Sequence, residues 1–175
     1  MIKAVTCFVL FVTSAGVGMV IASTLERRTK ALQELMYSVG LLQSRLEYYK
    51  EPLFLAMTKV APSCESTVGD FFLRVAELLE PPELMLLPDA FYKAMEEAKS
   101  RRGVFDVLLE EDQRPLMDLS ERLGADAKSQ QMALSLCITQ YEQLAEQSAE
   151  RAKKSAKLYR TSGTLIGALL VLLFI

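Results

Sequence analysis

The sequence contains no histidine. This absence removes the residue that most often acts as a general base, and also the most common zinc ligand. A GKS or GKT phosphate-binding loop, a GxGxxG motif and a CxxC pair are also missing, and a Ser-His-Asp set cannot form. The sequence therefore predicts a protein that is not an enzyme, with no catalytic residue, no cofactor and no metal site.

An excess of positive charge is missing as well. The chain has 20 Lys and Arg against 22 Asp and Glu, a net charge of -2, whereas nucleic-acid binders usually carry a strong basic excess. We therefore expect no nucleic-acid partner. The three cysteines, Cys7, Cys64 and Cys137, lack metal-ligand spacing and need no disulfide, which is typical of a reducing compartment.

A segment without charged residues lies near each end of the chain, over residues 4–25 and 161–175. Residues 4–25 would form a helix of about 33 Å, enough to cross a hydrocarbon core of about 30 Å. Residues 161–175 would reach only about 22 Å, but Tyr159 and Arg160 at their edge extend the usable segment. We predict a transmembrane helix at each end. The alternatives are a cleaved signal peptide for the first and a buried or interfacial helix for the second.

Positive residues flank both predicted membrane segments on the side that faces the middle of the chain. By the positive-inside rule, the middle is cytoplasmic and both termini lie outside the cytoplasm. These cations are also expected to contact anionic lipid headgroups. They are Arg27, Arg28 and Lys30 after the first segment, and Arg151, Lys153, Lys154, Lys157 and Arg160 before the second.

Small residues recur at a spacing of four within the predicted membrane segments. Such ladders let two helices approach closely in lipid, although glycine is also simply frequent in membrane helices. The first ladder is Ser14, Gly18 and Ala22, and the second is Gly163 and Gly167. We keep both interpretations open.

Residues 26–160 form the predicted cytoplasmic domain. Without residues 1–25 and 161–175, 62 of the remaining 135 residues are apolar, or 46%, which is an ordinary value for a globular domain. Residues 31–150 hold 21 acids and 11 bases, a net charge of -10. The small net charge of the whole chain thus hides an acidic body between two basic collars.

The pattern of apolar residues in this domain is that of helices throughout. Two long seams with heptad spacing predict a first and a last helix that pack antiparallel as a stalk, with shorter helices between them completing a six-helix-type bundle. No segment alternates as a strand does. The first seam comprises Leu25, Leu32, Leu35, Val39, Leu42, Leu46 and Tyr49, and the second Leu134, Cys137, Tyr141, Leu144 and Ser148.

Single residues mark helix ends and the core of this bundle. Gly124 is expected to follow a helix over residues 112–123 as its C′ residue, and Asp126 to N-cap the next helix. The aromatic residues are expected in the core rather than in a ligand site. They are Tyr48, Tyr49, Phe71, Phe72 and Phe91.

Charges of both signs cluster between Arg101 and Asp118. We interpret them as exposed and as the contact surface for a partner protein. Two alternatives are a divalent-cation site on the acid run at residues 110–112 and, least favoured, a hydrolase using Glu110 or Asp112. The predicted contact residues are Arg101, Arg102, Asp106, Glu110, Glu111, Asp112 and Asp118.

Several motifs together resemble one family. Leu116, Leu119, Leu123, Gly124, Asp126 and Gln130, after an acid run, are similar to the C-terminal signature of the stage III sporulation protein AB family. The segment Leu46-Glu-Tyr48 with Pro52-Leu53, and the basic stretch before a Gly- and Leu-rich end, match as well. Phe91-Tyr92 departs from the tryptophan of many members. The resemblance covers nearly the whole chain.

The resemblance implies a fold similar to the cytoplasmic six-helix bundles of type II secretion and type IV pilus platform proteins. It implies a place in the mother-cell membrane around the forespore of endospore-forming bacteria. The implied role is a platform that links a P-loop ATPase of the same operon to the membrane ring proteins of a secretion-like channel. A small channel- or holin-like membrane protein is the alternative, favoured by the small-residue ladders.

Overall fold

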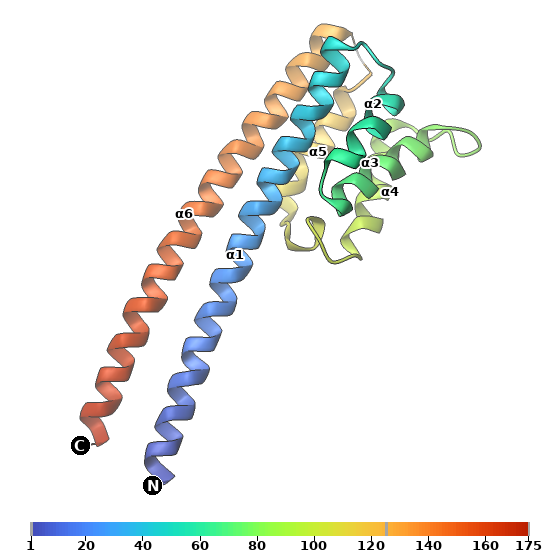
Figure 1. Ribbon diagram of the computed structural model, residues 1–175. Helices are drawn as coiled ribbons and strands as arrows, with labels where there is room; N and C mark the ends of the chain where they lie inside the picture. Colours follow the sequence, from blue (N-terminus) through green and yellow to red (C-terminus); the bar gives the residue numbers. More distant parts are fainter. Residues whose placement is uncertain (1, 125, 175) are drawn as a thin grey trace. The chain divides into compact units, whose positions relative to one another are not determined.

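The structure is a computed structural model that describes residues 2–124 and 126–174, and the side chains of residues 23–124 and 126–154. Over these residues it is helical and has no strand, which confirms the all-α prediction. The α-helices in chain order are α1 (Ile2–Tyr48), α2 (Leu53–Val60), α3 (Ser66–Leu79), α4 (Leu87–Lys99), α5 (Glu110–Arg122) and α6 (Ala127–Phe174), with short 3-10 turns η1 (Ala61–Ser63) and η2 (Phe105–Val107) (Figure 1).

The chain divides into two compact units. Unit 1 comprises residues 1–27 and 147–175, and unit 2 comprises residues 28–146. Helices α1 and α6 each contribute to both units. Among the described residues of unit 1, Lys154 and Glu150 form an exposed ion pair at 3.4 Å, one helical turn apart.

The predicted membrane segments fall largely on residues whose side chains the structure does not describe. Within the described part of the chain, no helix offers a stretch of the length and apolar character that a membrane span requires. The side chains of residues 4–22 and 161–175 are outside the described part, and these residues include Ser14, Gly18, Ala22, Gly163 and Gly167. The membrane segments and the domain limits at residues 25 and 160 therefore stay predictions.

The core of unit 2 is centred on an aromatic cluster. Phe71 of α3 lies 5.5 Å from Phe72, 5.5 Å from Phe91 of α4 and 5.1 Å from Phe105 of η2, measured between ring centroids. All four rings are buried, so the core assignment of Phe71, Phe72 and Phe91 is confirmed. These contacts join α3, α4 and η2 around one apolar centre.

In unit 2, α1 and α6 run antiparallel and side by side (Figure 1). Gln43 Nε2 donates a hydrogen bond to Ser135 Oγ at 3.1 Å across the pair. The buried positions follow the predicted seams, because a spacing of three and four residues keeps apolar side chains on one helix face. They are Leu32, Leu35, Val39 and Leu42 on α1, and Leu134, Cys137 and Tyr141 on α6.

The predicted seam on α1 extends too far. Helix α1 ends at Tyr48, and Tyr48 and Tyr49 are 82% and 65% exposed, so the expectation that these tyrosines lie in the core was wrong. The guanidinium of Arg45 lies 5.0 Å from the centroid of the exposed Tyr49 ring, within the range of a cation–π contact. Heptad spacing alone does not show where a helix leaves the core.

Prolines mark three of the helix boundaries, and one proline lies inside a helix. Pro52 precedes α2, Pro81 follows α3, and Pro88 lies in the first turn of α4. Pro115, however, lies inside α5, where it is buried. Helix α5 begins at Glu110, two residues before the predicted start at Asp112.

Candidate functional site

A buried ion pair joins the first turn of α5 to α1. Arg28 Nε donates to Asp112 Oδ2, and Arg28 Nη2 donates to Asp112 Oδ1, both at 2.8 Å. Nη2 also reaches Glu111 Oε1 at 2.8 Å. The side chains of Arg28 and Asp112 are 8% and 0% exposed, whereas Glu111 is 52% exposed. The planar guanidinium thus bridges two acids in a geometry that the single ammonium of a lysine cannot reproduce.

Asp112 has a second structural role. It is the third residue of α5, and its Oδ2 accepts a hydrogen bond from the backbone N–H of Leu109 at 2.9 Å. An acid in this position also complements the positive end of the helix dipole. The hydrogen bond to Asp112 raises the pKa of Arg28 above its ordinary value despite the burial of Arg28, so the guanidinium stays charged.

These contacts correct the interpretation of two residues. Asp112 is not an exposed charge, so it cannot present its carboxylate to a partner protein. Arg28 is a buried anchor within unit 2 rather than a free cation of the collar after the first predicted membrane segment. The sequence shows an acid three residues after Leu109, which is typical of a helix start, but it does not show which cation that acid meets.

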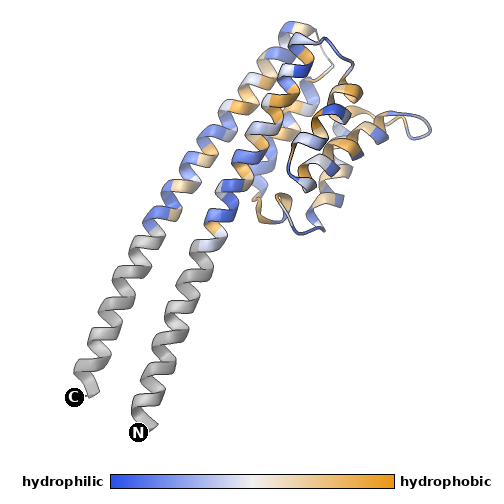
Figure 2. Cartoon of the chain, viewed as in Figure 1, coloured by the Kyte–Doolittle hydropathy of each residue, from blue (hydrophilic) through white to orange (hydrophobic). Residues whose placement is uncertain are grey.

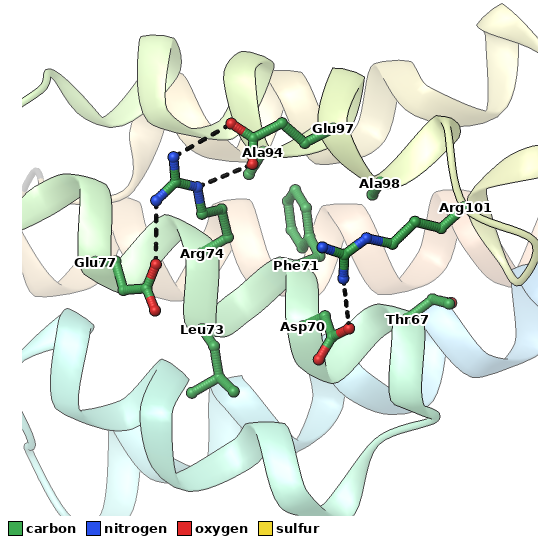
Figure 3. Close-up of a pocket in the computed structure, with 10 residues that line it drawn as sticks. All are labelled: Thr67, Asp70, Phe71, Leu73, Arg74, Glu77, Ala94, Glu97, Ala98 and Arg101. Atoms are coloured by element: carbon green, nitrogen blue, oxygen red, sulfur yellow. Dashed lines mark hydrogen bonds and ion pairs between the residues drawn. The ribbon is translucent and has the colours of Figure 1, made fainter.

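A charged groove of about 230 Å³ lies between α3 and α4 (Figure 3). Arg74 of α3 crosses it, donating from Nε to Glu97 Oε2 of α4 at 2.9 Å and from Nη1 to Glu77 Oε2 at 3.1 Å. The hydrogen bond to Glu97 raises the pKa of Arg74, and the same bond lowers the pKa of Glu97. At the other end of the groove, Arg101 Nη1 donates to Asp70 Oδ2 at 2.8 Å.

The predicted contact residues are only partly brought together. Glu111 and Asp112 meet at Arg28, whereas Arg101 reaches across the groove to Asp70, as Figure 3 shows. The exposed members of the predicted set are Arg101, Arg102, Asp106, Glu110, Glu111 and Asp118. Their role in binding a partner stays a prediction.

A second groove, of about 660 Å³, lies where α1 ends and α6 begins. Its lining includes Tyr48, Glu51 and Gln130. Glu51 Oε1 accepts from Lys59 Nζ at 2.5 Å, while Glu51 Oε2 is buried without a hydrogen-bond partner. A buried oxygen without a hydrogen-bond partner costs stability.

The cation site considered for residues 110–112 does not form around Asp112. Both carboxylate oxygens of Asp112 already accept hydrogen bonds from Arg28, and one accepts another from Leu109. Within the described part of the chain, no three acids, cysteines or histidines lie close enough together to hold a metal ion.

Comparisons with known proteins agree with the resemblance seen in the sequence. The sequence model of the family described as stage III sporulation protein AB (spore_III_AB) matches residues 3–175. The chain belongs to the stage III sporulation protein AB family. Stage III sporulation protein AB of Bacillus subtilis (strain 168) is 27% identical over 177 residues, which cover 99% of each chain. No solved structure matches the chain.

Membership of the stage III sporulation protein AB family implies a role in sporulation, and the family name denotes no enzyme activity. Its C-terminal signature has a structural meaning in this chain. Leu116, Leu119 and Leu123 are buried, because they lie on the core side of α5 and just after it.

Two other positions of the same signature, Gly124 and Asp126, lie at helix ends, as predicted. Gly124 has a φ of +89°, a backbone conformation that favours glycine, and it lies one residue past the C-cap of α5. Asp126 Oδ2 accepts from the Ser129 N–H at 3.1 Å, and Oδ1 accepts from the Ser129 hydroxyl at 2.7 Å. These bonds lower the pKa of Asp126.

Proposed function

We propose that the chain is a non-enzymatic membrane platform component of a sporulation secretion-like channel complex. It links a cytoplasmic P-loop ATPase to the membrane ring proteins of that complex, in the mother-cell membrane around the forespore. The bundle lies in the cytoplasm, and both termini of the chain lie on the other side of the membrane. Family membership over residues 3–175 is the observation that carries this proposal.

The buried anchor supports the proposal in physical terms. Arg28 fixes α1 to α5 only three residues after the end of the membrane segment predicted at residues 4–25. A platform must hold a folded domain in a defined position on the helix that enters the bilayer. A bidentate buried ion pair is suited to this, since it fixes both the position and the rotation of α1 against α5.

The test is binding between the purified full-length chain and the ATPase encoded in the same operon. The chain is held in detergent or in nanodiscs, and binding is measured with and without nucleotide. We expect the two proteins to co-purify in at least one nucleotide state. A lack of binding in all states would refute the link. Conductance across vesicles that contain the chain alone would favour the channel alternative instead.

The exposed charges of the predicted surface are tested in the same assay. The variant Arg101→Glu/Arg102→Glu/Glu110→Lys is expected to weaken binding of the ATPase and to leave the bundle folded. Asp112 is left unchanged, because reversal of a buried charge would disrupt the fold. The matched control reverses two positive charges and one negative charge at other exposed positions, as Arg122→Glu/Lys128→Glu/Glu142→Lys. Equal binding by both variants would place the interface elsewhere.

A further inference from the structure

The connection between α4 and α5, residues 100–109, ends in an apolar run. Within residues 104–109 only Asp106 is polar, and Figure 2 shows this part of the chain as mainly hydrophobic. Phe105 is buried in the core, whereas Leu109, at the end of the run, is 48% exposed. The run therefore starts inside the core of unit 2 and ends at its surface.

Leu109 and Arg28 donate to the same oxygen atom. Asp112 Oδ2 accepts from the Leu109 N–H at 2.9 Å and from Arg28 Nε at 2.8 Å. The backbone of Leu109 is therefore a direct neighbour of the Arg28 guanidinium. Figure 1 shows the connection from α4 to α5 at the end of unit 2 where its part of α1 begins. The exposed leucine thus lies at that end, beside the first residue of the unit.

The chain itself limits how far this end of unit 2 can lie from the membrane segment predicted at residues 4–25. Arg28 follows Leu25 by three residues, which cover about 4.5 Å along a helix axis and about 11 Å when fully extended. The headgroup layer on each side of the hydrocarbon core is about 5–8 Å thick. Helical side chains also lean toward the helix N-terminus, so the Arg28 side chain leans toward Leu25. A segment that spans the bilayer up to Leu25 therefore holds Arg28, and Leu109 beside it, close to the headgroups.

Leu86 provides a contrast at the start of α4. It is 74% exposed and is the N-cap of α4, as Leu109 is the N-cap of α5. The 13 residues of α4 are about 20 Å long and separate Leu86 from the connection that leads to Leu109. The two leucines share their local setting and differ in their place in unit 2, which makes Leu86 a matched control.

Charge does not favour a lipid contact at this edge. Residues 100–111 hold three exposed acids and two exposed cations, so they carry no positive excess that would attract anionic headgroups. A contact there depends on the apolar side chain and on the covalent link to the membrane segment, which keeps the local concentration of lipid high. The acids are Asp106, Glu110 and Glu111, and the cations are Arg101 and Arg102.

We propose that Leu109 is an apolar anchor that enters the headgroup layer of the membrane in which residues 4–25 are predicted to lie. The inference rests on the proposed function, because it requires that membrane segment. Two attachments, the membrane helix and Leu109, fix the orientation of the bundle on the bilayer. A platform that holds other proteins requires such a fixed orientation.

The test uses tryptophan fluorescence, because the sequence contains no tryptophan and each variant then carries a single reporter. Full-length Leu109→Trp and Leu86→Trp are reconstituted separately into phosphatidylcholine vesicles at a low ratio of protein to lipid. Bromine atoms on the upper part of the lipid acyl chains quench tryptophan over a short distance. We expect quenching of Leu109→Trp by about twofold or more and almost none of Leu86→Trp, although tryptophan favours interfaces equally in both variants.

Far-UV circular dichroism checks that both variants stay folded. Glu110→Trp, at the adjacent exposed position, repeats the measurement on the same edge if Leu109→Trp does not fold. Equal quenching of the reporters at the two ends of α4 would overturn the anchor.

A third reporter, Phe11→Trp, separates this inference from the proposed function. Phe11 lies in the predicted membrane segment, so lipids with bromine deep in the acyl chains should quench Phe11→Trp. If Phe11→Trp is quenched and Leu109→Trp is not, the anchor is refuted and the membrane segment stands. If neither is quenched, both the anchor and the membrane platform are refuted.

Two further readouts test other causes of a signal at Leu109. Its quenching should be the same with and without phosphatidylglycerol, and at low and high salt, because an apolar contact is not screened. Quenching that occurs only with phosphatidylglycerol would overturn the apolar anchor and assign the contact to Arg101 and Arg102. A blue shift of the Leu109→Trp emission without quenching by lipid would identify a second copy as the cover and would overturn the inference as well.

Discussion

The ion pair between Arg28 and Asp112 gives the sharpest prediction. In Arg28→Ala, Asp112 loses both hydrogen bonds from the guanidinium and keeps only the one from the Leu109 N–H. Removal of one partner from a buried pair typically costs about 3–5 kcal/mol, because the other charge is left buried and unpaired. We expect about 3 kcal/mol here, since Leu109 still satisfies one oxygen. The loss of the hydrogen bond to Glu111 adds little to this destabilisation, because Glu111 is half exposed.

The measurement is urea unfolding of the full-length chain in detergent, followed by far-UV circular dichroism. With a slope of about 2 kcal/mol per molar urea, a loss of about 3 kcal/mol lowers the midpoint by about 1.5 M. Lys30→Ala removes an exposed cation from the same helix and serves as the control. The urea midpoint of Arg28→Lys should lie between those of Arg28→Ala and Lys30→Ala, because an ammonium keeps the charge but not the bidentate geometry.

A double variant tests whether the two residues act as a pair. Asn at position 112 can still accept from the Leu109 N–H, so Arg28→Met/Asp112→Asn should lose less stability than the sum of the two single changes. The reasoning is refuted if Arg28→Ala unfolds within about 0.3 M urea of Lys30→Ala, since a buried pair should shift the midpoint several times further.

Three other changes have expected outcomes in the same unfolding assay. Tyr141→Phe should leave stability equal or raise it by about 1 kcal/mol, because the Tyr141 hydroxyl is buried without a hydrogen-bond partner; a loss above about 1 kcal/mol would contradict this. Gly69→Ala should destabilise by about 2 kcal/mol or more, since a Cβ there would lie 2.6 Å from the backbone oxygen of Ala61, and an unchanged midpoint would contradict this. Burial acts to raise the pKa of Glu65, but hydrogen bonds, chiefly from Thr67, outweigh burial and lower that pKa in the folded chain. The ionised Glu65 therefore stabilises the fold at a pH above its pKa in the unfolded chain, and this stabilisation is lost as the pH falls through its pKa in the folded chain. Glu65→Gln should therefore be less stable than the unchanged chain at pH 7, with the difference closing near pH 3; a constant difference would argue against the capping role.

The helices and much of the core could be predicted from local patterns. The spacing of Leu32, Leu35 and Leu42 identified the buried face of α1, because apolar residues three and four apart share one side of a helix. Gly124 and Asp126 identified the junction before α6, because each satisfies a local backbone requirement. Such signals involve residues near each other in the sequence.

The candidate sites depended on contacts between distant residues. Asp112 looked like its exposed neighbours Glu110 and Glu111, and only the packing of α5 against α1 buries it beside Arg28, 84 positions earlier. The exposure of Leu84 and Leu86 could not be predicted from the sequence either, because leucine residues are usually buried.

The sequence by itself determined that this chain is helical, that its long helices have one buried seam each, and that it resembles the stage III sporulation protein AB family. Helix periodicity, helix caps and family motifs depend on residues that are close together in the sequence, so they can be recognised without a structure. Only the tertiary structure decided which charged side chains are buried and which apolar side chains are exposed to solvent. Burial is set by neighbours far away in the sequence, and it decides whether a carboxylate such as Asp112 anchors the fold or faces a partner.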